Sequence, residues 1–250
     1  MGCLAHFRWI CQPVEFACGC CLHVHMTRSD DDRVAVLLDI DGTLVDSNYL
    51  HIDAWDRALV TAGHPVEMWR IHRAIGMDSA KLVDRLLGDE AAEVGEAAQR
   101  EHGRLYKEMT DRLRVIKGAR ELLQELSRRG HAVVLATSAP KDELAVLLDV
   151  LDVNESIDSV TSGEDVSAAK PDPGLIHIAL ERASVPADRA VMIGDSVWDI
   201  EAARRAGVAS IGVRAGGYGA EELLQAGASA VYDDVAHLLA ELDRSPISTF

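Results

Sequence analysis

Cysteine is missing from most of the chain. All five cysteines of the 250-residue sequence lie within the first 21 residues, and none follows. A disulfide framework for residues 22–250 is therefore excluded. The early stretch CGCCLHVH combines cysteines with two histidines, as a metal site does, but its spacing matches no paired Cys-x-x-Cys site. We interpret residues 1–32 as a disordered leader, with Met26 as an alternative start.

Positive charge and long apolar runs are also scarce. The sequence has 25 Lys and Arg residues and 41 Asp and Glu residues, which gives a formal net charge of −16. Nucleic acids and anionic membranes select basic surfaces, so we predict neither as a partner. No apolar run approaches the roughly 18 residues of a membrane span, and Pro13 and Glu15 interrupt any secretory signal. We therefore predict a cytoplasmic protein, either monomer or homodimer.

The sequence from residue 34 onward alternates short aliphatic runs with helical patterns. This alternation is typical of a parallel sheet covered by helices, and we predict an α/β fold with a doubly wound, Rossmann-like parallel sheet. The predicted strands are residues 34–40, 131–137, 156–162, 189–195, 208–213 and 229–233.

One interval breaks this alternation. Residues 47–114 are helical in pattern, rich in Ala, Glu and Leu, and contain no convincing strand. We predict that they form a small α-helical cap, inserted into a core built from residues 33–46 and 115–250. Ligands of doubly wound folds bind at the carboxyl ends of the strands, where this insert begins, so we expect the cap to cover the site.

The first predicted strand ends in two acids. In VAVLLDIDGTLVDS, Asp39 and Asp41 are separated by one residue and therefore point to the same side of an extended chain. Like charges this close are costly unless a positive group lies between them.

Polar residues also end other predicted strands. Thr137 and Ser138 follow the second strand, whereas Asp195 and Asp199 follow the run VMIG. Parallel strands share one carboxyl edge, and we place Lys170, from AAKPDP, at the same edge. Several carboxylates in one pocket need a hard divalent cation with oxygen ligands, which favours Mg²⁺. With Lys170 and the donors of Thr137 and of backbone amides, the set predicts a site for a phosphoryl group.

Four stretches, DIDGTL, LATS, AKPDP and GDSVWD, resemble in order and spacing the four motifs of the haloacid dehalogenase superfamily. The resemblance covers about residues 34–215. The helical insert is similar to the cap of the subfamily that includes phosphoglycolate phosphatase, sugar phosphatases and β-phosphoglucomutase. The resemblance implies a phosphoric monoester hydrolase.

The resemblance also implies catalytic roles. Asp39 would be the nucleophile that forms an aspartyl-phosphate, and Asp41 would protonate the leaving oxygen and later take a proton from water. Because Asp41 must start protonated, we expect the neighbouring acids to raise its pKa. Thr137 would donate to a phosphoryl oxygen, and Lys170 would offset the charge of Asp39 and of the phosphate.

The same resemblance implies the metal ligands and the phosphate loop. Mg²⁺ would be held by the carboxylates of Asp39 and Asp195 and by the backbone carbonyl of Asp41, with Asp199 behind them near the metal-bound waters. The remaining residues that we assign to phosphate binding are Gly42, Thr43 and Ser138.

Three residues of the insert are candidates for substrate contact. Arg73 and Lys81 have charges suited to a carboxylate or to hydroxyl groups, although charged residues on a helical insert usually form its solvated face. His51 either holds Asp41 poised for proton transfer or packs beneath the cap, and both interpretations stay open.

The sequence favours a phosphatase over several alternatives. Asp41 disfavours the dehalogenase and phosphonatase branches, which lack an acid there. A mutase of the β-phosphoglucomutase type is the main alternative, but the plain Gly-Asp of GDSVWD and Ser79, near the position where the mutase has Arg, disfavour it. An EF-hand is disfavoured because Leu44 and Leu50 replace its Gly and Glu. A non-catalytic ligand-binding role is a remote alternative. We predict hydrolysis of a small phosphomonoester, such as a sugar phosphate or phosphoglycolate.

Overall fold

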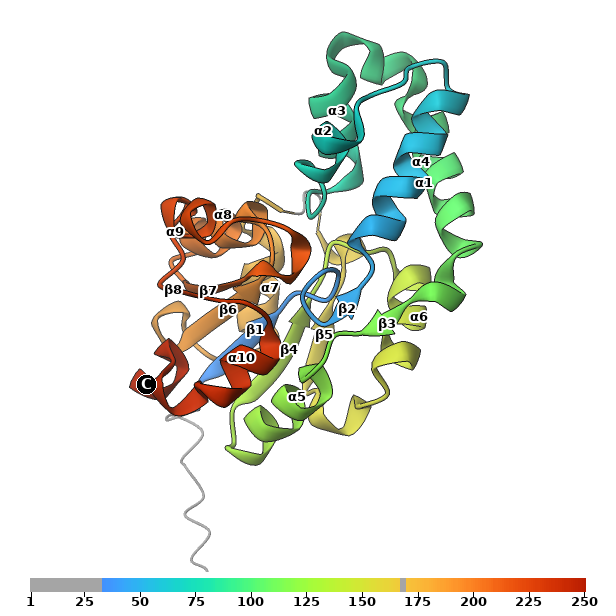
Figure 1. Ribbon diagram of the computed structural model, residues 1–250. Coiled ribbons are helices and arrows are strands. Elements are labelled where there is room, and N and C mark those ends of the chain that lie inside the picture. The colour runs from blue at the N-terminus through green and yellow to red at the C-terminus, as the bar shows by residue number, and fades with distance from the viewer. Residues whose placement is uncertain (1–32, 167–169) are drawn as a thin grey trace, which may run out of the picture.

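The computed structural model describes residues 33–166 and 170–250 (Figure 1). The predicted leader and the metal alternative within it, residues 1–32, lie outside the described residues. Within the described part of the chain, no helix is both long and apolar enough to cross a lipid bilayer.

Strands and helices alternate along the described chain, as the sequence predicts. The strands are β1 (Ala35–Leu38), β2 (Val45–Asp46), β3 (Arg114–Val115), β4 (Ala132–Ala136), β5 (Ser159–Thr161), β6 (Ala190–Gly194), β7 (Ala209–Val213) and β8 (Ala230–Tyr232). The α-helices are α1 (Asn48–Thr61), α2 (Met68–His72), α3 (Ser79–Leu87), α4 (Ala91–Lys107), α5 (Ala119–Arg128), α6 (Lys141–Leu151), α7 (Gly174–Ala183), α8 (Val197–Arg205), α9 (Ala220–Ala226) and α10 (Val235–Ala240).

The main sheet has the strand order β5-β4-β1-β6-β7-β8, and every neighbouring pair is parallel. All six predicted strands are present, which confirms the predicted doubly wound α/β fold. The strand β1 lies between β4 and β6, with Leu38 opposite Leu135 and Ile193. Its four residues are fully buried, because helices cover both faces of the sheet and a central strand must therefore be apolar on both sides.

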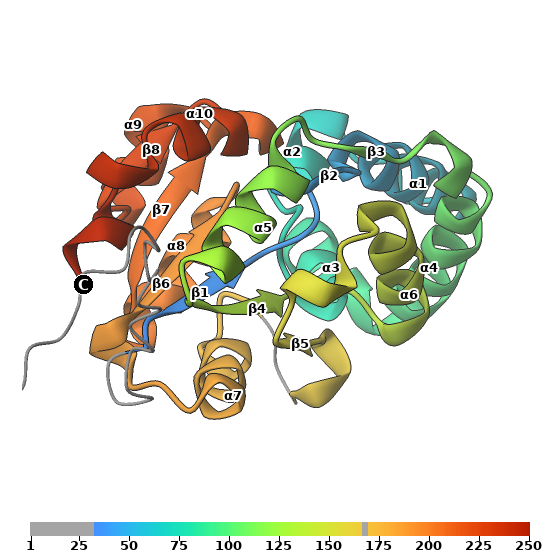
Figure 2. The same cartoon turned by 90° about the horizontal axis from the view of Figure 1, so that it is seen from below.

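Alternate residues of β1 enter two different apolar clusters. Val36 and Leu38 pack with residues of α5, α6 and α10 on one face, whereas Ala35 and Leu37 pack with residues of α7 and α8 on the other. Figure 2 places α5 and α7 on opposite sides of β1 and β4. This two-residue period is the direct consequence of strand geometry.

The helices α1–α4 form a separate lobe beyond the carboxyl edge of the sheet (Figure 1). We call α1–α4 and their connections the helical lobe. It has an apolar cluster of its own, which includes Trp55, Leu59, Ile71 and Leu82. The other faces of α1 and α4 join the main core, because Leu50, Ala58 and Leu105 belong to the same apolar cluster as Val36 and Leu38.

A two-stranded sheet lies at the base of the helical lobe, and the sequence did not predict it. The strands β2 and β3 pair antiparallel, with Val45 opposite Val115 and Asp46 opposite Arg114. Two residues per strand are too few to show an alternating pattern, so the periodicity of the sequence gave no sign of them. The pair ties together the two chain segments that lead into and out of the lobe.

Candidate active site

Three acidic side chains meet at the carboxyl edge of the sheet. Asp39 follows β1, Asp195 follows β6, and Asp199 lies in the first turn of α8. The two strands end at the same level because Leu38 lies opposite Ile193, and the Asp39 N–H donates to the Ile193 carbonyl oxygen at 2.9 Å. One carboxylate oxygen from each acid lies within 4.8 Å of the others, and all three acids are buried.

This crowding changes the acidity of the cluster. Burial raises the pKa of Asp39 well above its ordinary value, and the charges of Asp199 and Asp195 add to this although Lys170 opposes it. Burial and the charge of Asp199 raise the pKa of Asp195 as well. Buried carboxylates with raised pKa values need positive charge nearby, so the donor set fits a hard divalent cation.

Lys170 is a positive charge within this cluster. It is 1% exposed, and its Nζ lies 2.7 Å from Asp199 Oδ1 and forms a still shorter ion pair with Asp39. Burial acts to lower the pKa of Lys170, but the charges of Asp199 and Asp39 outweigh it and raise that pKa. Lys170 therefore stays charged and holds the Asp39 carboxylate in place.

The Asp195 carboxylate is held by two side chains. The Thr43 hydroxyl donates to Oδ1 at 3.0 Å, and the Asn48 side-chain amide donates to Oδ2 at 2.9 Å. A Cβ at Gly216 would lie 1.6 Å from Asp195 Oδ2, so glycine is needed where this loop passes the carboxylate. The sequence did not point to Asn48, because Asn at a helix start is ordinarily a capping residue.

Gly42 and Thr43 form the turn that follows β1. Gly42 has a φ of +73°, and a Cβ there would lie 2.2 Å from Asn48 Nδ2, so both backbone and space require glycine. The Gly42 N–H donates to the Val45 carbonyl oxygen and the Thr43 N–H to that of Ile40. Both amides are thus used inside the turn, and the predicted contribution of these two residues to phosphate binding is limited to shaping the loop.

Asp41 is paired with His51, the first of the three insert candidates. The Ser47 hydroxyl donates to Asp41 Oδ1 at 2.6 Å, and His51 Nε2 lies 3.5 Å from the same oxygen. Burial acts to raise the pKa of Asp41, but the hydrogen bonds and charge of His51, with Ser47, outweigh it and lower that pKa. Our expectation that neighbouring acids raise the pKa of Asp41 is therefore wrong, because the sequence did not bring His51 to this carboxylate.

His51 is itself held by rings from α4. Its Nδ1 lies 3.1 Å from His102 Nε2, and its ring stacks on Tyr106 with centroids 3.9 Å apart. The His102 ring in turn stacks on Trp55 at 4.2 Å. Burial, with the charge of His51, lowers the pKa of His102 well below its ordinary value, which suits His102 to accept a hydrogen bond from His51. Of the two open interpretations of His51, contact with Asp41 is the one that this geometry supports.

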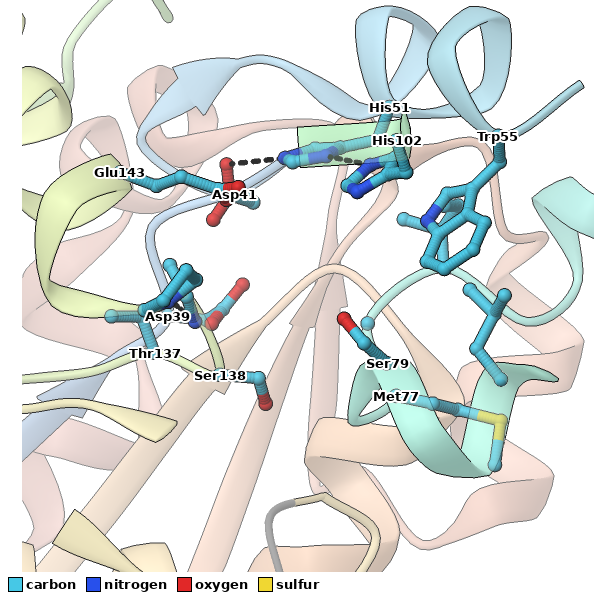
Figure 3. A pocket seen from close by; sticks show the side chains of 15 residues that line it. Asp39, Asp41, His51, Trp55, Met77, Ser79, His102, Thr137, Ser138 and Glu143 are labelled. Carbon is cyan, nitrogen blue, oxygen red and sulfur yellow. Dashed lines mark hydrogen bonds and ion pairs between the residues drawn. The ribbon is translucent and has the colours of Figure 1, made fainter. Parts of the chain in front are cut away.

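A cavity lies between the carboxyl edge of the sheet and the helical lobe (Figure 3), and we call it the inner cavity. Thr137 and Ser138 line it from the loop after β4, and the Thr137 hydroxyl accepts from the Ala139 N–H at 3.0 Å. The Ser138 hydroxyl has no hydrogen-bond partner among the described residues. The inner cavity is lined by Asp39, Asp41, His51, Trp55, Ile75, Gly76, Met77, Ser79, Leu82, His102, Thr137, Ser138, Ala139, Pro140 and Glu143.

Two titratable residues of this lining, Glu143 and His102, were not predicted from the sequence. Glu143 comes from the first turn of α6, where acids are ordinary, and His102 comes from the middle of α4. Burial raises the pKa of Glu143. The only sequence signal for Glu143 was its place shortly after LATS.

Arg73 and Lys81, the other two insert candidates, are not among the residues that line the inner cavity. Arg73 forms an ion pair with Glu222, and its guanidinium lies 4.1 Å from the ring centroid of Tyr218. The nearby His72 Nε2 lies 2.9 Å from the Gly216 carbonyl oxygen. The predicted substrate contact of Arg73 is thus corrected: in this structure Arg73 joins the helical lobe to the core.

Comparison with known proteins shows which family has this fold and these motifs. The family model of the haloacid dehalogenase-like hydrolases matches residues 36–213. The chain belongs to this family. This confirms the predicted family and, with it, the predicted class of enzyme, a haloacid dehalogenase-like phosphoric monoester hydrolase.

Relatives of this haloacid dehalogenase-like hydrolase cover most of the chain. A phosphoglycolate phosphatase of Pseudomonas syringae pv. tomato is 31% identical over 82% of this chain and 78% of its own. A phosphorylated carbohydrates phosphatase of Thermotoga maritima is 30% identical over 83% of this chain and 99% of its own. The crystal structure of a hydrolase from Pseudomonas syringae covers 85% of this chain and 99% of its own, with 36% identity and a TM-score of 0.80.

Proposed function

We propose that the protein is a Mg²⁺-dependent phosphatase that hydrolyses a small phosphomonoester through an aspartyl-phosphate intermediate on Asp39. The observation that carries this proposal is the position of Asp39. Its carboxylate lines the inner cavity, is ion-paired with the buried Lys170, and shares a cluster with Asp195 and Asp199. A carboxylate nucleophile divides the hydrolysis into two easier steps.

The acidic cluster is the proposed Mg²⁺ site. The Asp39 and Asp195 carboxylates and the Asp41 backbone carbonyl would hold the ion, with Asp199 behind them. These are all oxygen donors, as Mg²⁺ prefers. The raised pKa values of Asp39 and Asp195 also support this site, because a bound cation would stabilise the ionised form of both carboxylates. When bound, Mg²⁺ would neutralise charge on the phosphoryl group.

The remaining core residues would act on the phosphoryl oxygens. Lys170 Nζ keeps the Asp39 carboxylate oriented for attack. As negative charge spreads over the phosphoryl oxygens, we propose that Lys170 and the hydroxyl groups of Thr137 and Ser138 donate to them. Donors that are fixed before the reaction stabilise this charge without having to reorganise.

Asp41 is the proposed acid and base. His51 Nε2 lies 3.5 Å from Asp41 Oδ1, close enough for a proton to pass between them after a small movement. Asp41 would deliver that proton to the leaving oxygen in the first step and take one from the attacking water in the second. His51 would act through Asp41, as a positioning residue.

Residues 47–114 are the proposed cap. Their helices lie over the carboxyl edge of the sheet and contribute Trp55, Met77 and Ser79 to the inner cavity (Figure 3). A site enclosed in this way suits a small metabolite and would exclude water during the reaction. Both the carbohydrate phosphate and the phosphoglycolate named for the relatives are of this size. The cytoplasmic location and the choice between monomer and homodimer stay predictions.

The test is phosphate release from a panel of small phosphomonoesters, with and without Mg²⁺, by protein that begins at Met26. We expect release that depends on the metal. Interconversion of glucose 1-phosphate and glucose 6-phosphate with a bisphosphate primer, without net phosphate release, would instead favour the mutase. Absence of both reactions would overturn the proposal.

Removal of the metal is expected to abolish phosphate release. Treatment with EDTA should stop turnover, and excess Mg²⁺ should restore it. The same Mg²⁺ addition should raise the unfolding temperature, because a cation that binds only the folded state stabilises it. Turnover that persists in EDTA after dialysis would contradict the metal assignment.

A Gly216→Ala variant is expected to weaken Mg²⁺ binding by about 10- to 100-fold, as loss of supporting contacts does at metal sites. The added Cβ would fall 1.6 Å from Asp195 Oδ2 and force that carboxylate to move. The measurement is the Mg²⁺ concentration that gives half-maximal phosphate release. Gly103→Ala is the matched control, because a Cβ at Gly103 meets no atom within 4 Å.

A further inference from the structure

Glu143 is a buried acid whose carboxylate has no partner. The residue is 8% exposed, and its carboxylate makes no hydrogen bond or ion pair with any residue that the structure describes. Figure 3 shows its side chain reaching from α6 toward Asp41, into the inner cavity. A buried carboxylate without donors is costly, so a side chain in this position is suited to donors that a ligand brings.

The rest of the inner cavity offers no uncommitted positive partner for a second anion, because His51, whose charge also acts on Glu143, is already paired with Asp41. Its described lining contains no Lys or Arg. The helical lobe contributes mainly apolar side chains, such as Trp55 and Met77, together with the Ser79 hydroxyl. Once the phosphoryl group lies beside Asp39, the leaving group would occupy the space bounded by these residues and by His51, His102 and Glu143.

A second, more open depression continues outward from the inner cavity along α4, and we call it the outer groove. It shares Ser79, His102, Ser138, Pro140 and Glu143 with the inner cavity and adds three basic residues, Arg100, Arg104 and Lys107. Each of these three is already ion-paired: Arg100 with Glu96, Arg104 with Glu101 and Glu108, and Lys107 with Asp142. The positive charge of the outer groove is thus compensated by acids of the protein itself.

We propose that the leaving group is a neutral polyol, and that Glu143 accepts hydrogen bonds from its hydroxyl groups while it disfavours leaving groups that carry a carboxylate. This inference rests on the proposed phosphatase function and narrows its substrate class. Hydroxyl groups would supply the donors that Glu143 lacks, whereas a second carboxylate would lie beside an acid whose nearby cations, His51 and Lys107, are already paired with Asp41 and Asp142. Discrimination then combines an attractive contact with the right substrate and a repulsive one with the wrong substrate.

Matched pairs of substrates isolate this single difference. Glycerol 3-phosphate and 3-phosphoglycerate differ only in a CH₂OH group against a carboxylate, and glucitol 6-phosphate and 6-phosphogluconate differ in the same way on a longer chain. We expect the wild-type kcat/KM for each alditol phosphate to exceed that for its acid by about tenfold or more, the effect of one charged hydrogen bond. Para-nitrophenyl phosphate serves as a substrate without either group.

The variant Glu143→Gln keeps the shape and removes the charge. We expect it to reduce the alditol-to-acid ratio of kcat/KM by about tenfold, mostly through a rise for the acids. A ratio measured on one preparation is insensitive to the fraction of folded enzyme. Asp149→Asn is the matched control, because it removes one charge from an exposed position of the same helix and should leave the ratio unchanged.

The outcomes separate this inference from the proposed function. A wild-type enzyme that hydrolyses either acid as fast as its alditol would overturn the inference, and for the six-carbon acid it would indicate that the carboxylate reaches the outer groove. A ratio unchanged in Glu143→Gln would also overturn it. Hydrolysis of para-nitrophenyl phosphate alone would overturn it and leave the phosphatase function standing, whereas no hydrolysis of any ester with Mg²⁺ would overturn both.

Discussion

An Asp39→Asn variant is expected to lose phosphate release by a factor on the order of 10⁴ or more, as nucleophile removal does in other covalent enzymes. The amide cannot form the aspartyl-phosphate, and its neutral oxygen is a poorer metal ligand than the carboxylate. The measurement is Mg²⁺-dependent phosphate release from para-nitrophenyl phosphate under single-turnover and steady-state conditions. An Asp39→Ala variant, assayed beside it, guards against slow conversion of Asn back to Asp.

The same variant should fold at least as stably as the wild type. Burial raises the pKa of Asp39, so the folded protein without metal holds its ionised form at a cost, and the neutral amide removes this cost. We expect an unfolding temperature that is unchanged or higher, measured by circular dichroism. Asp188→Asn, at an exposed position, is the control and should keep full activity. Full activity in Asp39→Asn would overturn the assignment of the nucleophile.

A Lys170→Met variant is expected to lower kcat by about 10²- to 10³-fold and to change KM much less. Lys170 is ion-paired with Asp39 and Asp199 in the ground state, and its charge is needed most as negative charge moves onto the phosphoryl oxygens. An interaction that strengthens in the transition state affects kcat rather than KM. A large rise in KM at constant kcat would show that Lys170 only binds substrate.

Stability must be measured beside this effect. Loss of the buried cation leaves Asp39 and Asp199 without their shared partner, which costs about 3–5 kcal/mol in comparable buried pairs. Assays at low temperature with saturating Mg²⁺ keep the variant folded. Lys117→Met, at an exposed position, is the matched control for the change of side chain and charge.

The sequence alone determined the order of the elements. Short runs such as Ala35–Leu38 contain only apolar residues. Such runs are typical of strands that helices cover on both faces, and they therefore predicted a parallel sheet. The position of the motif acids followed as well, because residues that directly succeed parallel strands share one edge. The sequence therefore predicts Asp39, Asp195 and Lys170 at one edge of the sheet.

The environment of each acid was decided only by the tertiary structure. Asp41 was expected to have a raised pKa beside other acids, but the approach of His51 lowers it. His51 is ten residues away in sequence, and its ring is held against Asp41 by His102, from another helix. A pKa depends on distances of a few ångströms between such groups, and spacing along the chain does not contain those distances.

The roles of the charged residues where the helical lobe meets the core were likewise decided by how the lobe packs on the core. Arg73, which directly follows α2 of the helical lobe, and Glu143, on α6 of the core, are both charged, and nothing in their local sequence separates them. Packing turned Arg73 toward Glu222 and away from the cavity, whereas it buried Glu143 within the cavity wall. The sequence determined which residues stand at the strand ends, because strand order follows from local apolar patterns. Only the tertiary structure determined which helix faces meet there, because that depends on how the helices of the lobe pack against the core, to whose apolar cluster α1 and α4 contribute.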